Sequence, residues 1–233
     1  MPHLQAPARQ RSLAKEVRYA APRLIAGGIA VYLLLALTGL LLTRVLKGSG
    51  LTSADRGVSR WFYRDRTPTL NGVTHVGSML SDTTTAIVVT AALVIVLRLW
   101  LGRWREPIVV LTCILGELFI FLLVTATVHR SRPTVPHLDP APPTSSFPSG
   151  HTGAAVALYV GLVVVLVHVL GRRSWAWVVA VPLACIPIAV GVSRLYRGMH
   201  FLTDVVAGAI AGGLWMVIVV NVLLLGARTE APR

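Results

Sequence analysis

The sequence predicts an all-α, polytopic membrane protein with six transmembrane helices, and two observations lead to this fold class. Of the 233 residues, 55% are hydrophobic and only 13% are charged, and the mean hydropathy is +0.71. This composition excludes an ordinary water-soluble domain. The apolar residues also form runs long enough, as helices, to cross the hydrocarbon core of a bilayer, which is about 30 Å thick.

Six charge-poor runs are the predicted spans. The first, residues 24–43, is long enough to cross the membrane as a helix. The second, residues 83–97, is short unless the helix continues past Arg98, whose side chain would then extend to the interface. Pro182 and Pro187 are expected to interrupt the fifth span. The remaining spans are expected at residues 107–128, 152–170, 175–192 and 205–225.

The spans are expected to form one domain, residues 24–227, between a basic tail at residues 1–23 and a short tail at residues 228–233. The first tail contains prolines and shows little periodicity, so it is expected to be flexible or to lie on the membrane surface. Between the first two spans, Trp61, Phe62 and Tyr63 lie among arginines, a pattern typical of an interfacial helix.

The distribution of Lys and Arg predicts the orientation in the membrane. Six spans place both termini on one side, and with the termini in the cytoplasm 12 Lys and Arg residues fall inside and 10 outside. Four of the outer arginines cluster in two loops that hold candidate site residues, and without them the ratio is 12 to 6. Because cytoplasmic loops are enriched in these residues, both termini are predicted to be cytoplasmic. The net charge of +13 then indicates contact with anionic lipids and not with nucleic acid.

Three separated segments with phosphate-binding chemistry fall at the outer face in this topology. Arg132 and Arg194 supply planar guanidinium groups that match phosphate oxygens. Ser149 and Gly150 add a hydroxyl and backbone N–H groups at the start of a helix, with Pro148 as its first residue. The segments are Arg130-Ser131-Arg132-Pro133, Pro148-Ser149-Gly150-His151, and Ser193-Arg194 followed by His200 and Asp204.

Two histidines and one carboxylate in these segments can divide the work of phosphoryl transfer. His200 and Asp204 are four residues apart, so a helix would place them on one face, with the carboxylate accepting from one imidazole nitrogen. The other nitrogen is then a nucleophile that can form a phosphohistidine. His151 can protonate the leaving oxygen and later activate water.

On these motifs the chain resembles the type-2 phosphatidic acid phosphatase family, which shares its active site with vanadium haloperoxidases. The family's third motif, Ser-Arg, five residues, His, three residues, Asp, is matched from Ser193 to Asp204, and the second, Pro-Ser-Gly-His, from Pro148 to His151. The resemblance implies hydrolysis of phosphate esters without a metal or other cofactor. It also implies His200 as nucleophile, Asp204 as its orienter, His151 as acid, and Arg132, Arg194, Ser149 and Gly150 on the phosphate.

The first motif of the family is only partly present. The family has Lys, six residues and then Arg-Pro; Arg132 and Pro133 fit, but Thr125 stands where the lysine is expected. One phosphate-binding cation is therefore missing. Thr125 could donate a neutral hydrogen bond instead, or the cation could come from Arg130, His129 or Arg197.

Glu117 lies in the middle of the third span, where an ionisable side chain requires a partner or a wet cavity. We expect an arginine partner, with a protonated glutamate bonded to a neighbouring helix as the alternative. Cys113 and Cys185 lie in apolar runs and are predicted to be buried thiols. Asp139 lies in a proline-rich loop and is predicted to form a turn. The histidines lack the spacing of metal ligands, so no zinc site is predicted.

The predicted function is removal of a terminal phosphate from a membrane lipid at the outer leaflet. Phosphatidic acid, phosphatidylglycerol phosphate and undecaprenyl pyrophosphate all fit as substrates. The alternative is a non-catalytic protein that binds or transports a lipid phosphate, which Thr125 and Glu117 make conceivable. Gly208 and Gly212 are four residues apart and allow a close helix contact, but the oligomeric state stays open.

Overall fold

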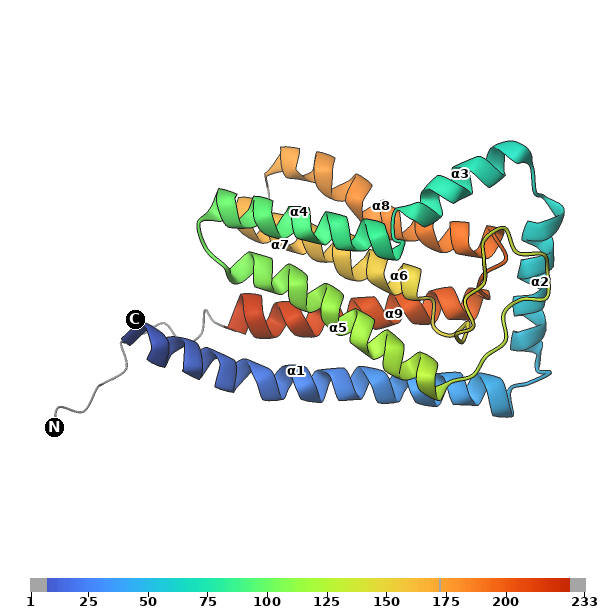
Figure 1. Cartoon of the computed structure of the whole chain (residues 1–233), viewed down its shortest axis with the longest axis horizontal. Helices are drawn as coiled ribbons and strands as arrows, with labels where there is room; N and C mark the ends of the chain where they lie inside the picture. Colours follow the sequence, from blue (N-terminus) through green and yellow to red (C-terminus); the bar gives the residue numbers. More distant parts are fainter. Residues whose placement is uncertain (1–7, 172, 227–233) are drawn as a thin grey trace.

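A bundle of long helices forms the body of the protein (Figure 1). The structure is a computed structural model that describes residues 8–171 and 173–226. Within these residues, six helical stretches are long and apolar enough to cross a membrane, which confirms the predicted fold class. They are Arg18–Val45, Thr83–Leu101, Arg105–Thr127, Gly150–Leu170, Trp175–Tyr196 and Leu202–Leu225.

The first helix, α1, extends from Ala8 to Leu40 and continues as a π-helical turn, Leu41–Val45. The prediction of an aperiodic tail before residue 24 is therefore wrong from Ala8 onward. The segment is rich in Ala and Arg, which have high helix propensity, and the adjoining span removes the cost of nucleation. Residues 1–7 and 227–233, which include the predicted C-terminal tail, lie outside the described residues.

Two short helices, α2 (Gly50–Arg64) and α3 (Pro68–Met79), fill the connection where one interfacial helix was predicted. α2 lies across the end of the bundle, at a steep angle to the spans (Figure 1). Its aromatic residues Trp61 and Tyr63 are exposed, whereas its polar residues Asp55 and Ser59 are buried against the bundle. The polar face of this helix therefore points into the protein, which its sequence alone did not indicate.

Helices α4 (Thr83–Leu101) and α5 (Arg105–Thr127) form the next hairpin. The Asp82 side chain caps α4 by accepting from the Thr85 N–H, and Gly102 ends the helix in a left-handed conformation. The second span therefore continues past Arg98, whose guanidinium lies 5.4 Å from the Trp104 ring centroid. This contact agrees with an arginine that extends towards the interface.

The fourth span combines α6 (Gly150–Ala155), a π-helical segment (Val156–Val160) and α7 (Gly161–Leu170). The fifth, α8 (Ser174–Tyr196), contains Pro182 and Pro187 without an interruption, so the predicted break is wrong. Each proline removes one backbone hydrogen bond of the helix. Proline is tolerated in transmembrane helices because neighbouring helices and side chains satisfy the backbone groups that it leaves free. The sixth span begins with α9 (Leu202–Val219) and ends with a π-helical segment (Val220–Leu225).

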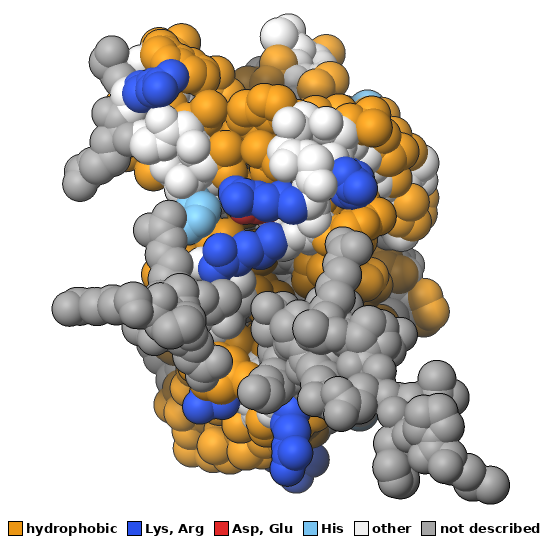
Figure 2. Space-filling model, turned by 90° about the vertical axis from the view of Figure 1, so that its left-hand side faces the viewer, with side chains coloured by type: hydrophobic (Ala, Val, Ile, Leu, Met, Phe, Trp, Pro, Cys, Tyr) orange, Lys and Arg blue, Asp and Glu red, His pale blue; other side chains and the backbone are white. Residues whose placement is uncertain are grey.

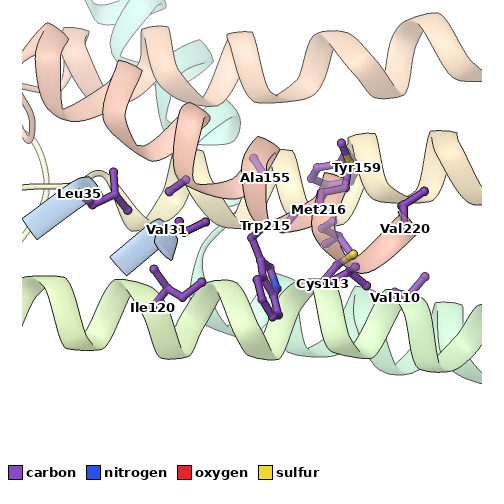
Figure 3. Close-up of a cluster of buried hydrophobic side chains, with 14 of the residues drawn as sticks. Val31, Leu35, Val110, Cys113, Ile120, Ala155, Tyr159, Trp215, Met216 and Val220 are labelled. Carbon is purple, nitrogen blue, oxygen red and sulfur yellow. The ribbon is translucent and has the colours of Figure 1, made fainter. Parts of the chain in front are cut away.

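The core lies where α1, α5, α6 and α9 meet, and Figure 3 shows side chains such as Val31, Cys113 and Trp215 in one cluster. Close approach of α9 to α6 depends on glycine. A Cβ atom at Gly208 or Gly212 would overlap the carbonyl oxygen of Ser149 or Gly153, respectively. The Gly208–Gly212 spacing therefore serves a contact within the chain. Cys113 is buried as predicted, but Cys185 is exposed, because α8 turns part of its apolar surface outward.

Different segments of the chain lie at the two ends of the bundle. α1 begins and the sixth span ends at one end, while α2 and the long loop of residues 128–149 lie at the other (Figure 1). At the first of these ends, basic side chains are visible among hydrophobic ones (Figure 2). This end also contains Arg103 and Arg173, in short connections, and Arg105, the first residue of α5.

Candidate active site

A cavity of about 790 Å³ lies between α4, α5 and α6, below the loop of residues 128–149. This volume is in the range of small-molecule sites. One part of its wall is apolar, with residues such as Ile87 of α4 and Leu118 of α5. The other part is polar and brings together residues from five separate segments: His75, Arg132, Asp139, His151, Arg194 and His200.

The turn before α6 is held in place by Ser149. Its N–H donates to the Asp204 carbonyl oxygen at 2.9 Å, and its hydroxyl is bonded to that of Thr152 at 3.0 Å. Pro148 was predicted to be the first residue of this helix. Ser149 is the N-cap residue, so Pro148 instead precedes the helix. Ser149 is fully buried and does not line the cavity. From this motif, Gly150 and His151 reach the cavity wall, whereas Ser149 contacts Thr152 and Asp204 and lies outside that wall.

His200 lies in a connection and not on a helix. α8 ends at Tyr196, Gly198 adopts a left-handed φ of 75°, and α9 begins at Leu202. The predicted helical face shared with Asp204 is therefore wrong. The Nδ1–H of His200 donates to the Ser146 carbonyl oxygen at 2.7 Å, whereas Asp204 Oδ2 is 3.9 Å from the same nitrogen.

The protonation of His200 follows from these contacts. A carbonyl acceptor fixes the proton on Nδ1, so Nε2 keeps its lone pair. Burial, together with the positive charges of Arg194 and Arg132, holds the pKa of His200 well below its usual range. The ring is therefore neutral at pH 7 and can act as a nucleophile.

Arg130 is enclosed by carboxylates and does not line the cavity. Its two terminal nitrogens form ion pairs with Asp204 and, at 2.7 Å, with Asp55 of α2. Its guanidinium also lies 4.5 Å from the ring centroid of Phe201. Asp55 further accepts from the N–H and the hydroxyl of Thr203, at 3.1 and 2.6 Å. This ion-pair network around Arg130 ties α2 to the start of α9, and the sequence analysis did not identify Asp55.

Another carboxylate, that of Asp139 in the long loop, forms ion pairs with two arginines. It lies 2.5 Å from Arg197 and 3.0 Å from Arg194, so it forms ion pairs in addition to lying in the predicted loop. Burial raises the pKa of Asp139, but the hydrogen bond and charge of Arg197, with the charge of Arg194, outweigh burial and hold it below its usual range. Asp139 is therefore ionised at neutral pH.

None of the four candidates for the missing lysine lines the cavity. Arg130 and Arg197 are held by carboxylates, and His129 is exposed. The Thr125 hydroxyl donates to the Leu122 carbonyl oxygen within its own helix, at 3.0 Å. Another imidazole does reach the cavity wall, that of His75 on α3. No motif surrounds His75 in the sequence, so the sequence did not indicate that it lines the cavity.

Arg132 and Arg194 are the arginines that line the cavity. Arg132 donates from Nη1 to the Met199 carbonyl oxygen, and Arg194 donates to the Ser78 hydroxyl, both at 2.8 Å. The Nε atoms of both are buried and have no hydrogen-bond partner. Buried donors without a partner are unfavourable, so this pair is suited to an anion. In the described part of the chain, no group of three or more His, Cys, Asp and Glu side chains is placed to hold a metal ion.

Glu117 also lines the cavity, on the membrane side of the polar wall. The side chain is 5% exposed and forms no ion pair with any described residue, so the predicted arginine partner is wrong. Its carboxyl group rests against Gly153 of α6, where a Cβ atom would overlap Oε1. Glu117 was therefore correctly singled out by its position in a span, but its environment differs from the one expected.

Comparison with known proteins agrees with the fold and the site. The family model of the PAP2 superfamily matches residues 106–225, which include the second and third motifs and Arg132. The chain therefore belongs to the PAP2 superfamily, and the family resemblance stated from the motifs is confirmed. The protein is accordingly an enzyme of the phosphatase class and, with six apolar spans, an integral membrane protein.

Individual relatives cover most of the chain. It is 28% identical over 181 residues to phosphatidylglycerophosphatase B of Bacillus subtilis strain 168, which corresponds to 72% of this chain and 83% of that protein. It is also 28% identical over 153 residues to undecaprenyl-diphosphatase BcrC of the same organism, over 60% of this chain and 74% of that protein.

Two solved structures share the fold. The crystal structure of a transmembrane PAP2-type phosphatidylglycerolphosphate phosphatase from Bacillus subtilis matches with a TM-score of 0.73 and 24% identity, covering 88% of this chain and 98% of that one. Aquifex aeolicus LpxE matches with a TM-score of 0.57 and 24% identity, covering 71% and 93% of the two chains.

Proposed function

We propose that this protein removes the terminal phosphate of a membrane lipid, without a metal ion, through a phosphohistidine at His200. The observation that supports this most strongly is that His200 lines the same cavity as Arg132 and Arg194, and that each of these arginines has a buried Nε without a hydrogen-bond partner. The cavity continues between membrane spans, where a lipid tail fits. Phosphatidic acid, phosphatidylglycerol phosphate and undecaprenyl diphosphate all combine such a tail with a terminal phosphate.

In the first step, the Nε2 lone pair of His200 attacks phosphorus while the bond from phosphorus to the leaving oxygen breaks. His151 donates a proton to that oxygen, so the dephosphorylated lipid leaves as a neutral hydroxyl or as a shorter phosphate. Arg132, Arg194 and the Gly150 N–H hold the other phosphate oxygens as negative charge develops on them. The Ser146 carbonyl keeps the His200 ring in place, and the Asp204 carboxylate stabilises its positive charge.

In the second step, water releases the phosphate. His151, now neutral, accepts a proton from a water molecule whose oxygen bonds to phosphorus. The bond between phosphorus and His200 Nε2 then breaks, the lone pair returns to the ring, and inorganic phosphate leaves. Both histidines are restored to their starting forms.

We place the cavity at the outer face of the membrane and both termini in the cytoplasm. Arg103 and Arg173 lie in short connections, and Arg105 begins α5, at the bundle end opposite the cavity, where basic side chains are visible (Figure 2). Basic residues in short loops favour the cytoplasmic side. An outward site would act on lipids of the outer leaflet.

The test is release of inorganic phosphate from the three lipids by purified protein in detergent with EDTA. We expect turnover that survives EDTA and is abolished in His200→Ala. His129→Ala, which changes an exposed histidine outside the cavity, should keep wild-type turnover. Phosphorylated protein trapped from wild type but not from His200→Ala would support the intermediate. Folded wild-type protein that binds these lipids but releases no phosphate would instead favour the binding or transport function.

A further inference from the structure

We propose that Thr90 and Glu117 form a second polar subsite, which binds the ester-linked glycerol backbone of a diacyl lipid phosphate. The inference rests on the proposed function and names the substrate class of the same cavity. It favours a glycerolipid phosphate over a polyprenyl diphosphate. The two residues come from α4 and α5, which pack side by side along the cavity (Figure 1).

Thr90 has a hydroxyl group without a partner inside a membrane span. The residue is 6% exposed and lines the cavity, and its Oγ1 has no hydrogen bond. A threonine in a helix commonly donates to a carbonyl of the preceding turn. Thr38 and Thr74 do so in this protein, at 2.7 Å each. Thr90 therefore lacks the hydrogen bond that a helical threonine commonly forms, and it is a residue that lines a cavity.

Glu117 contributes a second polar group at a short distance from the phosphate-binding turn. Its carboxyl group lies against Gly153, which is three residues, or about 4.5 Å along a helix, beyond Gly150. It has no ion pair among the described residues, and an uncharged carboxyl group is far less costly in a membrane than a carboxylate. In that form Glu117 can donate a hydrogen bond.

The Thr90 hydroxyl has no hydrogen-bond partner, and Glu117 has no ion pair among the described residues, so both suit a ligand that supplies acceptors at this depth. The glycerol backbone of a diacyl lipid has two ester carbonyl oxygens a few bonds from its phosphate. A polyprenyl diphosphate has only hydrocarbon beyond its phosphates, so both donors would stay unsatisfied. The surrounding wall, with Ile87, Ala91 and Leu118, is apolar and suits the acyl chains in either case.

The test compares dioleoyl phosphatidic acid with its diether analogue, which has the same chain length but no carbonyl groups. We expect wild-type protein to hydrolyse the ester with a kcat/KM about tenfold higher, as two hydrogen bonds of ordinary strength would give. Thr90→Val and Glu117→Leu should each reduce this preference about threefold. Glu117→Gln, which keeps a donor, should retain it, as should Thr84→Val, which changes an exposed residue of the same helix outside the cavity.

The same comparison is made for equilibrium binding to His200→Ala protein, alone and with each subsite substitution. An ester preference in binding that Thr90→Val and Glu117→Leu reduce supports the subsite even if the wild type shows no turnover, in which case only the proposed function fails. Equal hydrolysis of ester and ether by wild type overturns the subsite and leaves the phosphatase function standing. Binding without any preference overturns the subsite as well.

Discussion

Arg130 and Arg132 are two residues apart in the sequence, but they belong to different regions of the molecule. Arg130 forms ion pairs with Asp55 and Asp204 and does not line the cavity. Arg132 lines the cavity, has no carboxylate partner among the described residues, and keeps an unpaired Nε. The carboxylates that distant helices bring to Arg130 therefore give it a structural role, whereas the chemically identical Arg132 is left for the phosphate-binding role proposed above.

The largest effect is expected for Arg130→Met. Removing this cation leaves Asp55 and Asp204 buried without a counter-charge, which should destabilise the protein by about 3–5 kcal/mol. Thermal unfolding in detergent measures this. Arg132→Met is the matched control and should lose far less stability, because it breaks no ion pair. Equal losses in the two variants would contradict the division between the two regions.

The next effect concerns catalysis by the cavity arginines. Arg132→Lys and Arg194→Lys keep the positive charge but lose the planar arrangement of donors, so kcat/KM should fall by about 10²–10³ with the fold retained. Phosphate release with phosphatidic acid measures this, and the unfolding temperature monitors the fold. Activity within threefold of wild type in both variants would show that these guanidinium groups do not bind the phosphate.

A smaller effect is expected on the pH dependence of stability, through His200. Its folded-state pKa is held well below the unfolded value, which is about 6.5, by burial and by Arg194 and Arg132. As the pH falls below that value, the unfolded state takes up a proton that the folded state does not, so stability decreases by up to about 1.4 kcal/mol per pH unit. His200→Gln should show a shallower decrease between pH 7 and 5. An unchanged slope would mean that His200 is protonated in the folded protein.

The smallest effect is expected for Asp139→Asn. Asp139 is ion-paired with Arg194, so a phosphate that binds Arg194 would compete with this carboxylate. Inhibition by orthovanadate, a phosphate analogue, should therefore strengthen about threefold in the variant. Because the pKa of Asp139 lies below its usual range, the difference should persist from pH 8 to 5. Asp65→Asn, an exposed site between α2 and α3, is the control. Weaker inhibition in Asp139→Asn would show that Asp139 supports phosphate binding instead.

The sequence by itself determined the six spans and the place of the site. A run of apolar residues must match the thickness of the bilayer, so hydropathy alone locates the six spans, although α1 begins well before the predicted residue 24. The number of spans between two motifs also decides whether they meet at the same face. Arg132, Gly150, His151, Arg194 and His200 do come together at one end of the bundle, as this reasoning predicted.

Only the tertiary structure decided which charges are paired. Asp55 and Asp139 were not identified as ion-pair partners, because the arginines they contact lie 55 or more residues away in the sequence. Glu117 was assigned an arginine and has none among the described residues, whereas Ser146 and not Asp204 accepts the hydrogen bond from His200. Hydropathy and helical periodicity depend on neighbours along the chain. Hydrogen bonds and ion pairs depend on which side chains the packed helices and the folded loop bring within about 3 Å of each other.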